Sequence, residues 1–269
     1  MSRSNPTADP ILNPSKRWFQ WDSTTKGFKY YDKDLPNPKD ASKKGANVMV
    51  PIPFKFVVLD VLTTVGGFSD KAKGSFYGNE VRNFMGATKT EIMEVKLKGE
   101  TVLKGSWDSI KQQAEAMDAK FANSIYIGYF DENKQMQLGN IKLFGSSIGA
   151  WIEVVNAVTK SGKKISDCAF KVATTNPGKK GAVEWNEPVF ELITVKPETD
   201  AKAMELDTEL QAFLKSYFSR TSTGAPIGEE AASEIAAAEA YANSTATETI
   251  EESAGVTMAT STVVEDEDF

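Results

Sequence analysis

Aromatic and basic side chains are mixed over residues 16–31, and this mixture has the chemistry that holds single-stranded nucleic acids. Aromatic faces stack on bases while Lys and Arg neutralise phosphates, so a groove for single strands needs both types along one surface. The residues with this chemistry are Lys16, Arg17, Trp18, Trp21, Lys29, Tyr30 and Tyr31. The alternative interpretation is that the rings pack into a core, and we expect a mixture of core rings and stacking rings.

Further basic residues lie on segments that we expect to be loops between strands. Two lysine pairs stand next to glycines, and lysines on such loops can contact the phosphate backbone. These residues are Lys163, Lys164, Lys179 and Lys180. The alternative interpretation is that they are solvated turn lysines. Arg82, Lys96, Lys98, Lys104 and Lys142 could also line a groove, although the sequence does not show that they share a face.

The charge of the chain is divided unequally. Residues 1–220 hold 31 basic and 26 acidic side chains, a net charge of +5. Residues 221–269 hold eleven acidic side chains and no Lys or Arg, so this tail carries −11 and the whole chain −6. The acidic average therefore hides a mildly basic body, which is compatible with a polyanionic partner.

The chain closes with four acidic residues followed by a phenylalanine. A C-terminal phenylalanine offers a ring for a small apolar pocket and an α-carboxylate, with the acids, for a basic rim. We expect these residues to bind partner proteins: Glu265, Asp266, Glu267, Asp268 and Phe269. The alternative interpretation is a tail that only increases solubility.

Several enzyme classes are excluded by composition. The chain has no histidine and one cysteine, Cys168, which excludes catalysis by Ser-His-Asp or Cys-His groups and an ordinary structural zinc site. Asp60, Glu91, Glu94 and Lys96 faintly resemble the carboxylate and lysine set of metal-dependent nucleases. Charged residues on the solvent face of a strand explain this set equally well. We therefore expect no catalytic residues, no metal and no cofactor.

The location expected from the sequence is the cytoplasm, or that of a host cell if a phage encodes the protein. No run of 18 apolar residues occurs, so no membrane span is predicted. Residues 1–6 contain no apolar segment of the kind found in secretory signals.

Alternating apolar residues and turn signals predict a mainly β body. We expect a hairpin over residues 16–31, a loop over 32–46, and strands over 54–65, 92–98, 101–104, 124–130, 136–144, 150–158, 167–174 and 182–195. Apolar residues at three- to four-residue spacing predict helices over 106–121 and 199–218.

This order of elements favours a Greek-key barrel of the OB type with insertions, one helix between strands and a C-terminal helix. A β-sandwich fits the strand count almost as well. We expect a flexible N-terminal arm over residues 1–15, an OB-fold domain that binds single-stranded DNA over 16–220, and a disordered acidic tail over 221–269.

The chain resembles the single-stranded DNA-binding proteins of phages. The tail resembles the acidic C-termini of these proteins, which end in Phe, although Asp268 stands where bacterial relatives usually have proline. The body resembles them over residues 13–21 (NPSKRWFQW), 50–60 (VPIPFKFVVLD), 69–81, 124–127 and 149–151. This resemblance implies an OB fold, nonspecific binding of single-stranded DNA, no enzymatic activity, and a tail that recruits replication or recombination enzymes such as a polymerase, helicase, primase or nuclease.

The resulting hypothesis is a protein that coats single-stranded DNA during replication and recombination. A tethered tail with the charge sign of DNA could also occupy the basic groove until DNA displaces it. The alternative hypotheses are a single-strand annealing recombination protein, a metal-dependent nuclease and a virion or scaffold protein. The protein could form homo-oligomers, which the sequence does not decide.

Overall fold

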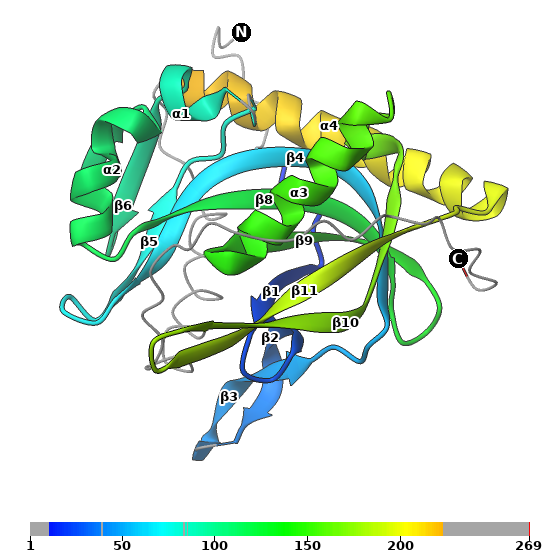
Figure 1. Ribbon diagram of the computed structural model, residues 1–269, viewed down its shortest axis with the longest axis horizontal. Helices are drawn as coiled ribbons and strands as arrows, with labels where there is room; N and C mark the ends of the chain where they lie inside the picture. Colours follow the sequence, from blue (N-terminus) through cyan, green and yellow to red (C-terminus); the bar gives the residue numbers. More distant parts are fainter. Residues whose placement is uncertain (1–10, 39, 83, 85, 223–268) are drawn as a thin grey trace, which may run out of the picture.

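The computed structural model describes residues 11–38, 40–82, 84, 86–222 and 269 (Figure 1). Within these residues, eleven strands form one mixed sheet, with four α-helices and a short 3-10 helix. The flexible arm was predicted over residues 1–15 and the disordered tail over 221–269. Of these, residues 1–10 and 223–268, including Glu265, Asp266, Glu267 and Asp268, lie outside the described residues, whereas residues 221 and 222 are helical.

The centre of the sheet has the strand order β3-β2-β1-β9-β8-β4. These strands are β1 (Arg17–Asp22), β2 (Gly27–Asn37), β3 (Asp40–Met49), β4 (Phe54–Ser69), β8 (Lys120–Phe130) and β9 (Met136–Phe144). Strand β1 pairs with β9 in parallel, whereas the other pairs in this order are antiparallel. The parallel pair brings residues near the N-terminus beside residues more than a hundred positions later.

The long strand β4 connects two smaller groups of strands. One end pairs with β5 (Gly74–Gly78), which continues into β6 (Met93–Leu97) and β7 (Glu100–Gly105). The other end pairs with β10 (Ala169–Lys180), which pairs with β11 (Val183–Ile193). The mainly β prediction is confirmed, but the described strands form an open sheet rather than the expected closed barrel.

The sheet is curved, and side chains link strands that are not hydrogen-bonded neighbours. The indole Nε1 of Trp21 in β1 donates to the carbonyl oxygen of Asn186 in β11 at 2.8 Å. The side-chain Nδ2 of Asn186 donates to the carbonyl oxygen of Ser23 at 3.0 Å. These two bonds hold β11 against the β1–β2 turn without a backbone ladder.

The helices are α1 (Ala87–Thr90), α2 (Trp107–Ala116), α3 (Ser146–Lys160) and α4 (Pro197–Ser222), and the 3-10 helix is η1 (Ile165–Asp167). The predicted helices over residues 106–121 and 199–218 correspond to α2 and α4. In α2 the buried residues Trp107, Ile110 and Ala114 have the expected spacing. Helices α3 and α4 cover opposite faces of the sheet, while α2 packs on β5–β7 (Figure 1).

Two predictions from local pattern are wrong. Residues 150–158 form part of α3 rather than a strand, because the buried residues Trp151, Val155 and Val158 are spaced by four and three. Apolar residues are so dense in this segment that they fit both periodicities. The predicted loop over 32–46 belongs to β2 and β3, whose polar side chains face solvent and so lack an alternating pattern.

The main core lies on the face of the sheet that α3 covers, which we call the inner face, and it is rich in aromatic rings. Large, fully buried side chains from β1, β2, β4, α3 and β10 meet there: Phe19, Phe28, Phe56, Trp151 and Phe170. Several pairs are edge to face, such as Trp151 and Phe170 at a centroid distance of 5.4 Å. Strand alternation sends the intervening side chains to the outer face, which α4 covers only in part.

Candidate nucleic-acid interface

The outer face of β1, β2 and β9 brings together residues with the chemistry for single strands. Trp18 lies opposite Asn140, and Gln20 lies opposite Lys142 in the parallel β1–β9 pair. Gln20 also lies opposite Lys29 in β2, and Tyr31 follows two positions later. Because side chains alternate along a strand, these residues share one face, with Phe19 and Tyr30 on the other.

Trp18 lies half-buried on this face, and its polar atom has no partner. Its Nε1 is a buried donor that has no acceptor. Beside it, the buried oxygens Gln20 Oε1 and Asn140 Oδ1 have no donor. Most buried polar atoms in proteins are paired, and leaving one unpaired costs about 1–3 kcal/mol. These three atoms have almost no exposed surface, and Asn140 is 1% exposed, so a ligand on this face would reach the half-buried ring of Trp18 rather than these atoms.

Tyr31 is the second half-buried ring of this face, and it lies along β3. A Cβ atom placed on Gly45 would be 1.7 Å from the Tyr31 hydroxyl oxygen, so only glycine leaves room for this ring position. Gly45 also has a φ of +108°, a conformation that other residues rarely adopt. Tyr31 is thus held in place by the backbone of β3.

A buried polar network on the same face holds Asn140 in place. Asn140 Nδ2 donates to Ser124 Oγ at 2.8 Å, and the Ser124 hydroxyl donates to a carboxylate oxygen of Glu80. Tyr126 donates to the other Glu80 oxygen at 2.8 Å, and the Glu80 backbone N–H donates to the Tyr217 hydroxyl at 2.8 Å. The network therefore fixes β9 relative to β8 and α4.

Replacing Tyr217 by Phe is expected to lower the free energy of unfolding by about 1–3 kcal/mol, because the buried Glu80 N–H loses this acceptor. Urea unfolding measures the change. Tyr31→Phe is the matched control and is expected to unfold within about 0.5 kcal/mol of the parent, since it changes a half-buried surface residue. Equal unfolding midpoints for the two variants would contradict the role of the Tyr217 hydroxyl.

Two predicted stacking residues lie in the core instead. Trp21 and Tyr30 are each 8% exposed and face inward with Phe19 and Phe28. Neither ring can stack on a base in this structure, so Trp18 and Tyr31 are the rings available in the N-terminal cluster. The sequence indicated a mixture of core and surface rings, but not which ring took which place.

Two predicted cationic contacts are engaged in ion pairs. Arg17 donates to both carboxylate oxygens of Glu132, at 2.8 and 2.9 Å, and its guanidinium lies 4.2 Å from the ring centroid of Tyr30. The hydrogen bond from Arg17 holds the pKa of Glu132 below its ordinary value. Lys29 Nζ lies 2.7 Å from an Asp22 oxygen and is buried. Both cations therefore serve the fold.

The remaining predicted lysines are exposed, but they are not gathered in one place. Lys16 directly precedes β1, at the edge of the outer face. Lys163 and Lys164 follow α3, whereas Lys179 and Lys180 end β10, with Lys179 paired to Glu184. Strand β10, which is roughly 36 Å long at a rise of about 3.3 Å per residue, begins after the first pair and ends at the second.

One of these lysine pairs belongs to a hairpin that contacts the β1–β2 turn and the inward-facing Trp21, not the outer face. The hairpin that carries Lys179 and Lys180 also carries Asn186, which is bonded to Ser23 in the β1–β2 turn. Lys142, which the sequence could not assign to a face, lies on the outer face by its register with Gln20. Gln20 and Asn140 were not identified from the sequence, because their importance arises from the parallel β1–β9 pairing.

The carboxylates that resembled a nuclease set are dispersed. Glu94 accepts hydrogen bonds from Thr101 at 2.8 Å and Lys104 at 3.1 Å, which hold its pKa below the ordinary value. Asp60 lies on another strand and accepts a bond from Gln211 in α4 at 3.2 Å. In the described part of the chain, no three His, Cys, Asp or Glu residues are placed to hold a metal ion.

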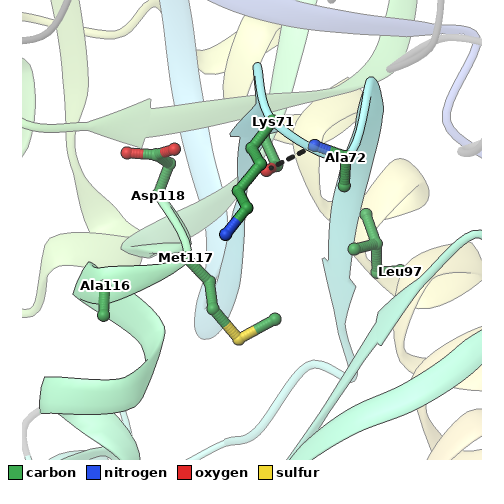
Figure 2. Close-up of a pocket in the computed structure, with 7 residues that line it drawn as sticks. Lys71, Ala72, Leu97, Ala116, Met117 and Asp118 are labelled. Atoms are coloured by element: carbon green, nitrogen blue, oxygen red, sulfur yellow. Dashed lines mark hydrogen bonds between the residues drawn. The ribbon is translucent and has the colours of Figure 1, made fainter.

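A pocket of about 410 Å³ lies away from this face, between the β4–β5 hairpin and the end of α2. Figure 2 shows Lys71 extending from the hairpin towards Met117, with Leu97 on the far side. The residues that line it are Ser69, Lys71, Ala72, Leu97, Ala116, Met117 and Asp118. One lysine and one aspartate in a small apolar setting form no recognisable catalytic group.

Phe269, the predicted anchor for partners, is buried against the body. Its side chain is 2% exposed and belongs to the cluster under α4. Phe269 therefore lies on the side of the sheet that also bears the candidate interface, but among the α4 residues rather than beside Trp18.

Neither a family model, nor a curated protein, nor a solved structure matches the chain. Among the described helices, none has both the length and the apolar character to cross a membrane.

Proposed function

We propose that this protein binds single-stranded DNA without sequence preference and coats it during phage replication or recombination. The observation that carries the proposal is the outer face of β1 and β9, where the half-buried ring of Trp18 shares one face with Gln20 and Lys142. A base can stack on the half-buried ring, and a lysine on the same face can meet a phosphate. Tyr31, Lys16 and Lys142 extend the same chemistry along the strands.

Charge and fold support the same function. The net charge of +5 over residues 1–220 favours a polyanion, and Lys142 and Lys16 lie at the proposed surface. The three-stranded meander β1–β2–β3 packs an aromatic core inside and presents its other face outward. We assign this half of the sheet to an opened barrel of the OB type, a fold that binds oligonucleotides on such a face.

Quenching of tryptophan fluorescence by oligo(dT) tests the proposal directly. Four of the five tryptophans are at most 8% exposed (Trp21, Trp107, Trp151 and Trp185), so the quenching should report on Trp18. We expect quenching at low salt that Trp18→Phe removes, and weaker binding as salt rises because bound counterions are released. No quenching at low salt would overturn the proposal.

Replacing Lys142 by Gln is expected to reduce the salt dependence of binding. Each phosphate neutralised on a single strand contributes about 0.7 to the slope of log K against log salt, so the slope should fall by roughly that amount. Lys111→Gln, in α2 on another part of the fold, is the matched control and should leave the slope unchanged. An unchanged slope in Lys142→Gln would place the phosphates elsewhere.

We further propose that the acidic tail recruits replication or recombination enzymes. The support is the sequence of residues 265–269, in which four acids precede a terminal aromatic ring. Since Phe269 is buried against residues 11–222, a partner can bind this ring only after the ring has dissociated from them.

A further inference from the structure

The last residue of the chain packs on the folded body, although residues 223–268 separate it from α4. The Phe269 ring lies 5.6 Å from the Phe130 ring at an interplanar angle of 84°, an edge-to-face contact. A terminal oxygen of Phe269 accepts the backbone N–H of Lys196 at 3.0 Å. Ring and carboxylate are thus both engaged.

The apolar half of this contact is a continuous part of the cluster beneath α4. Its members come from β4, β8, β9, β10, β11 and α4, and they include Leu138, Ile193, Ala203 and Leu210, with Val195 and Leu206 at its margin. Burying a phenylalanine ring in such surroundings is favourable, because apolar surface is removed from water. The cluster therefore provides a place for one more ring.

The polar half of the contact is the N-terminus of α4. Lys196 immediately precedes the helix, and its carbonyl oxygen accepts the first helical bond from Asp200 at 2.9 Å. Backbone N–H groups at a helix N-terminus are electropositive and bind anions. Lys202, six residues after Lys196, lies with its Nζ 5.7 Å from the Phe130 centroid. An α-carboxylate therefore fits here better than an internal carbonyl.

We propose that this is a binding site for a C-terminal phenylalanine, and that its occupant is the protein's own Phe269. The connecting 46 residues have a maximum reach of about 150 Å, whereas the 26 residues of α4 cover about 39 Å, so the chain end can return to the start of the helix. Binding here withholds the ring and carboxylate of Phe269 from other proteins. The inference does not depend on DNA binding.

Hydrogen exchange of the full-length protein without DNA tests this site. The Lys196 amide should be protected, and Phe269→Ala should speed its exchange by at least about tenfold, since the site loses the ring that holds the acceptor oxygen in place. Val263→Ala is the matched tail variant and should leave the exchange rate unchanged. An equal rate at Lys196 in the parent and Phe269→Ala would overturn the proposal.

A peptide rescue tests the recognition of ring and carboxylate together. A nonapeptide with the sequence of residues 261–269 (STVVEDEDF) and a free carboxylate should restore protection of Lys196 in Phe269→Ala. The same peptide with an amidated C-terminus should not. Equal rescue by both peptides would overturn recognition of the carboxylate, and no rescue by either would overturn the site.

Dilution of the parent protein distinguishes its own Phe269 from that of a second copy. Protection at Lys196 should be unchanged over a 100-fold dilution if the occupant is in the same chain. Protection that falls on dilution would assign the occupant to another copy and overturn this part of the proposal. All three measurements are made without DNA, so their failure and a failure of the proposed function are distinguishable.

Discussion

Replacing Trp18 by Ala is expected to weaken binding of oligo(dT) by about 5- to 150-fold, because one stacked base contributes roughly 1–3 kcal/mol. Trp18 is the residue to change because its ring is half-buried on the outer face and its Nε1 has no partner in the fold. Anisotropy of a labelled oligonucleotide at fixed salt measures the loss. Trp18→Phe should recover most of the affinity, since a ring remains for stacking.

The matched control for Trp18 is a surface aromatic elsewhere in the sheet. Tyr77→Ala removes a half-buried ring from β5, beyond β4 and away from β1 and β9. We expect this variant to bind oligo(dT) as the parent does. Unfolding curves of both variants establish that the fold is intact. Parent-like affinity in Trp18→Ala would exclude the outer face of β1 as the stacking surface.

Replacing Asp22 by Asn is expected to lower the free energy of unfolding by about 3–5 kcal/mol at pH 7, because the change removes the carboxylate that pairs with the buried Lys29. The side chain of Lys29 is 6% exposed and that of Asp22 is 17% exposed. Asn retains an oxygen for the backbone N–H groups of Thr24 and Thr25, so the variant isolates the loss of charge. Urea unfolding at constant pH measures the effect.

The same pair makes a prediction about pH. Burial raises the pKa of Asp22, but hydrogen bonds from Lys29, Thr25 and Thr24 outweigh it, so the folded pKa lies below the ordinary value of 3.8. The stabilisation by ionised Asp22 is therefore fully present above pH 3.8 and is lost as pH falls through the lower, folded pKa. The difference between the parent and Asp22→Asn should be constant above that pH and shrink below it.

An exposed ion pair provides the control for Asp22. Asp70 pairs with Lys73 at 3.4 Å, and both side chains are mostly exposed. Asp70→Asn should change the free energy of unfolding by less than about 1 kcal/mol. If Asp22→Asn were as mild as Asp70→Asn, Lys29 would be reaching solvent rather than depending on its partner, and its predicted role as a phosphate contact would regain support.

Much of the fold could be predicted from local patterns, and much of the candidate site could not. The helical spacing of Trp107, Ile110 and Ala114 and the apolar face of α4 are visible in the sequence because a helix places such residues on one side. Residues 150–158 of α3 were assigned to a strand, because seven of these nine residues are apolar and fit both periodicities. Trp18 and Trp21 have the same residue type, and only the neighbouring strands decide which one is buried.

The sequence by itself determined the properties that depend only on composition and local pattern. These are the basic body, the acidic tail ending in Phe269, the lack of histidine chemistry and the mainly β character. The tertiary structure alone decided which residues meet: Trp18 beside Asn140, Lys29 against Asp22, and Phe269 at the start of α4. The physical reason is that strand register and the position of the C-terminal residue depend on packing between segments distant in the sequence. A one-residue shift in the register of a strand would turn every one of its side chains to the other face.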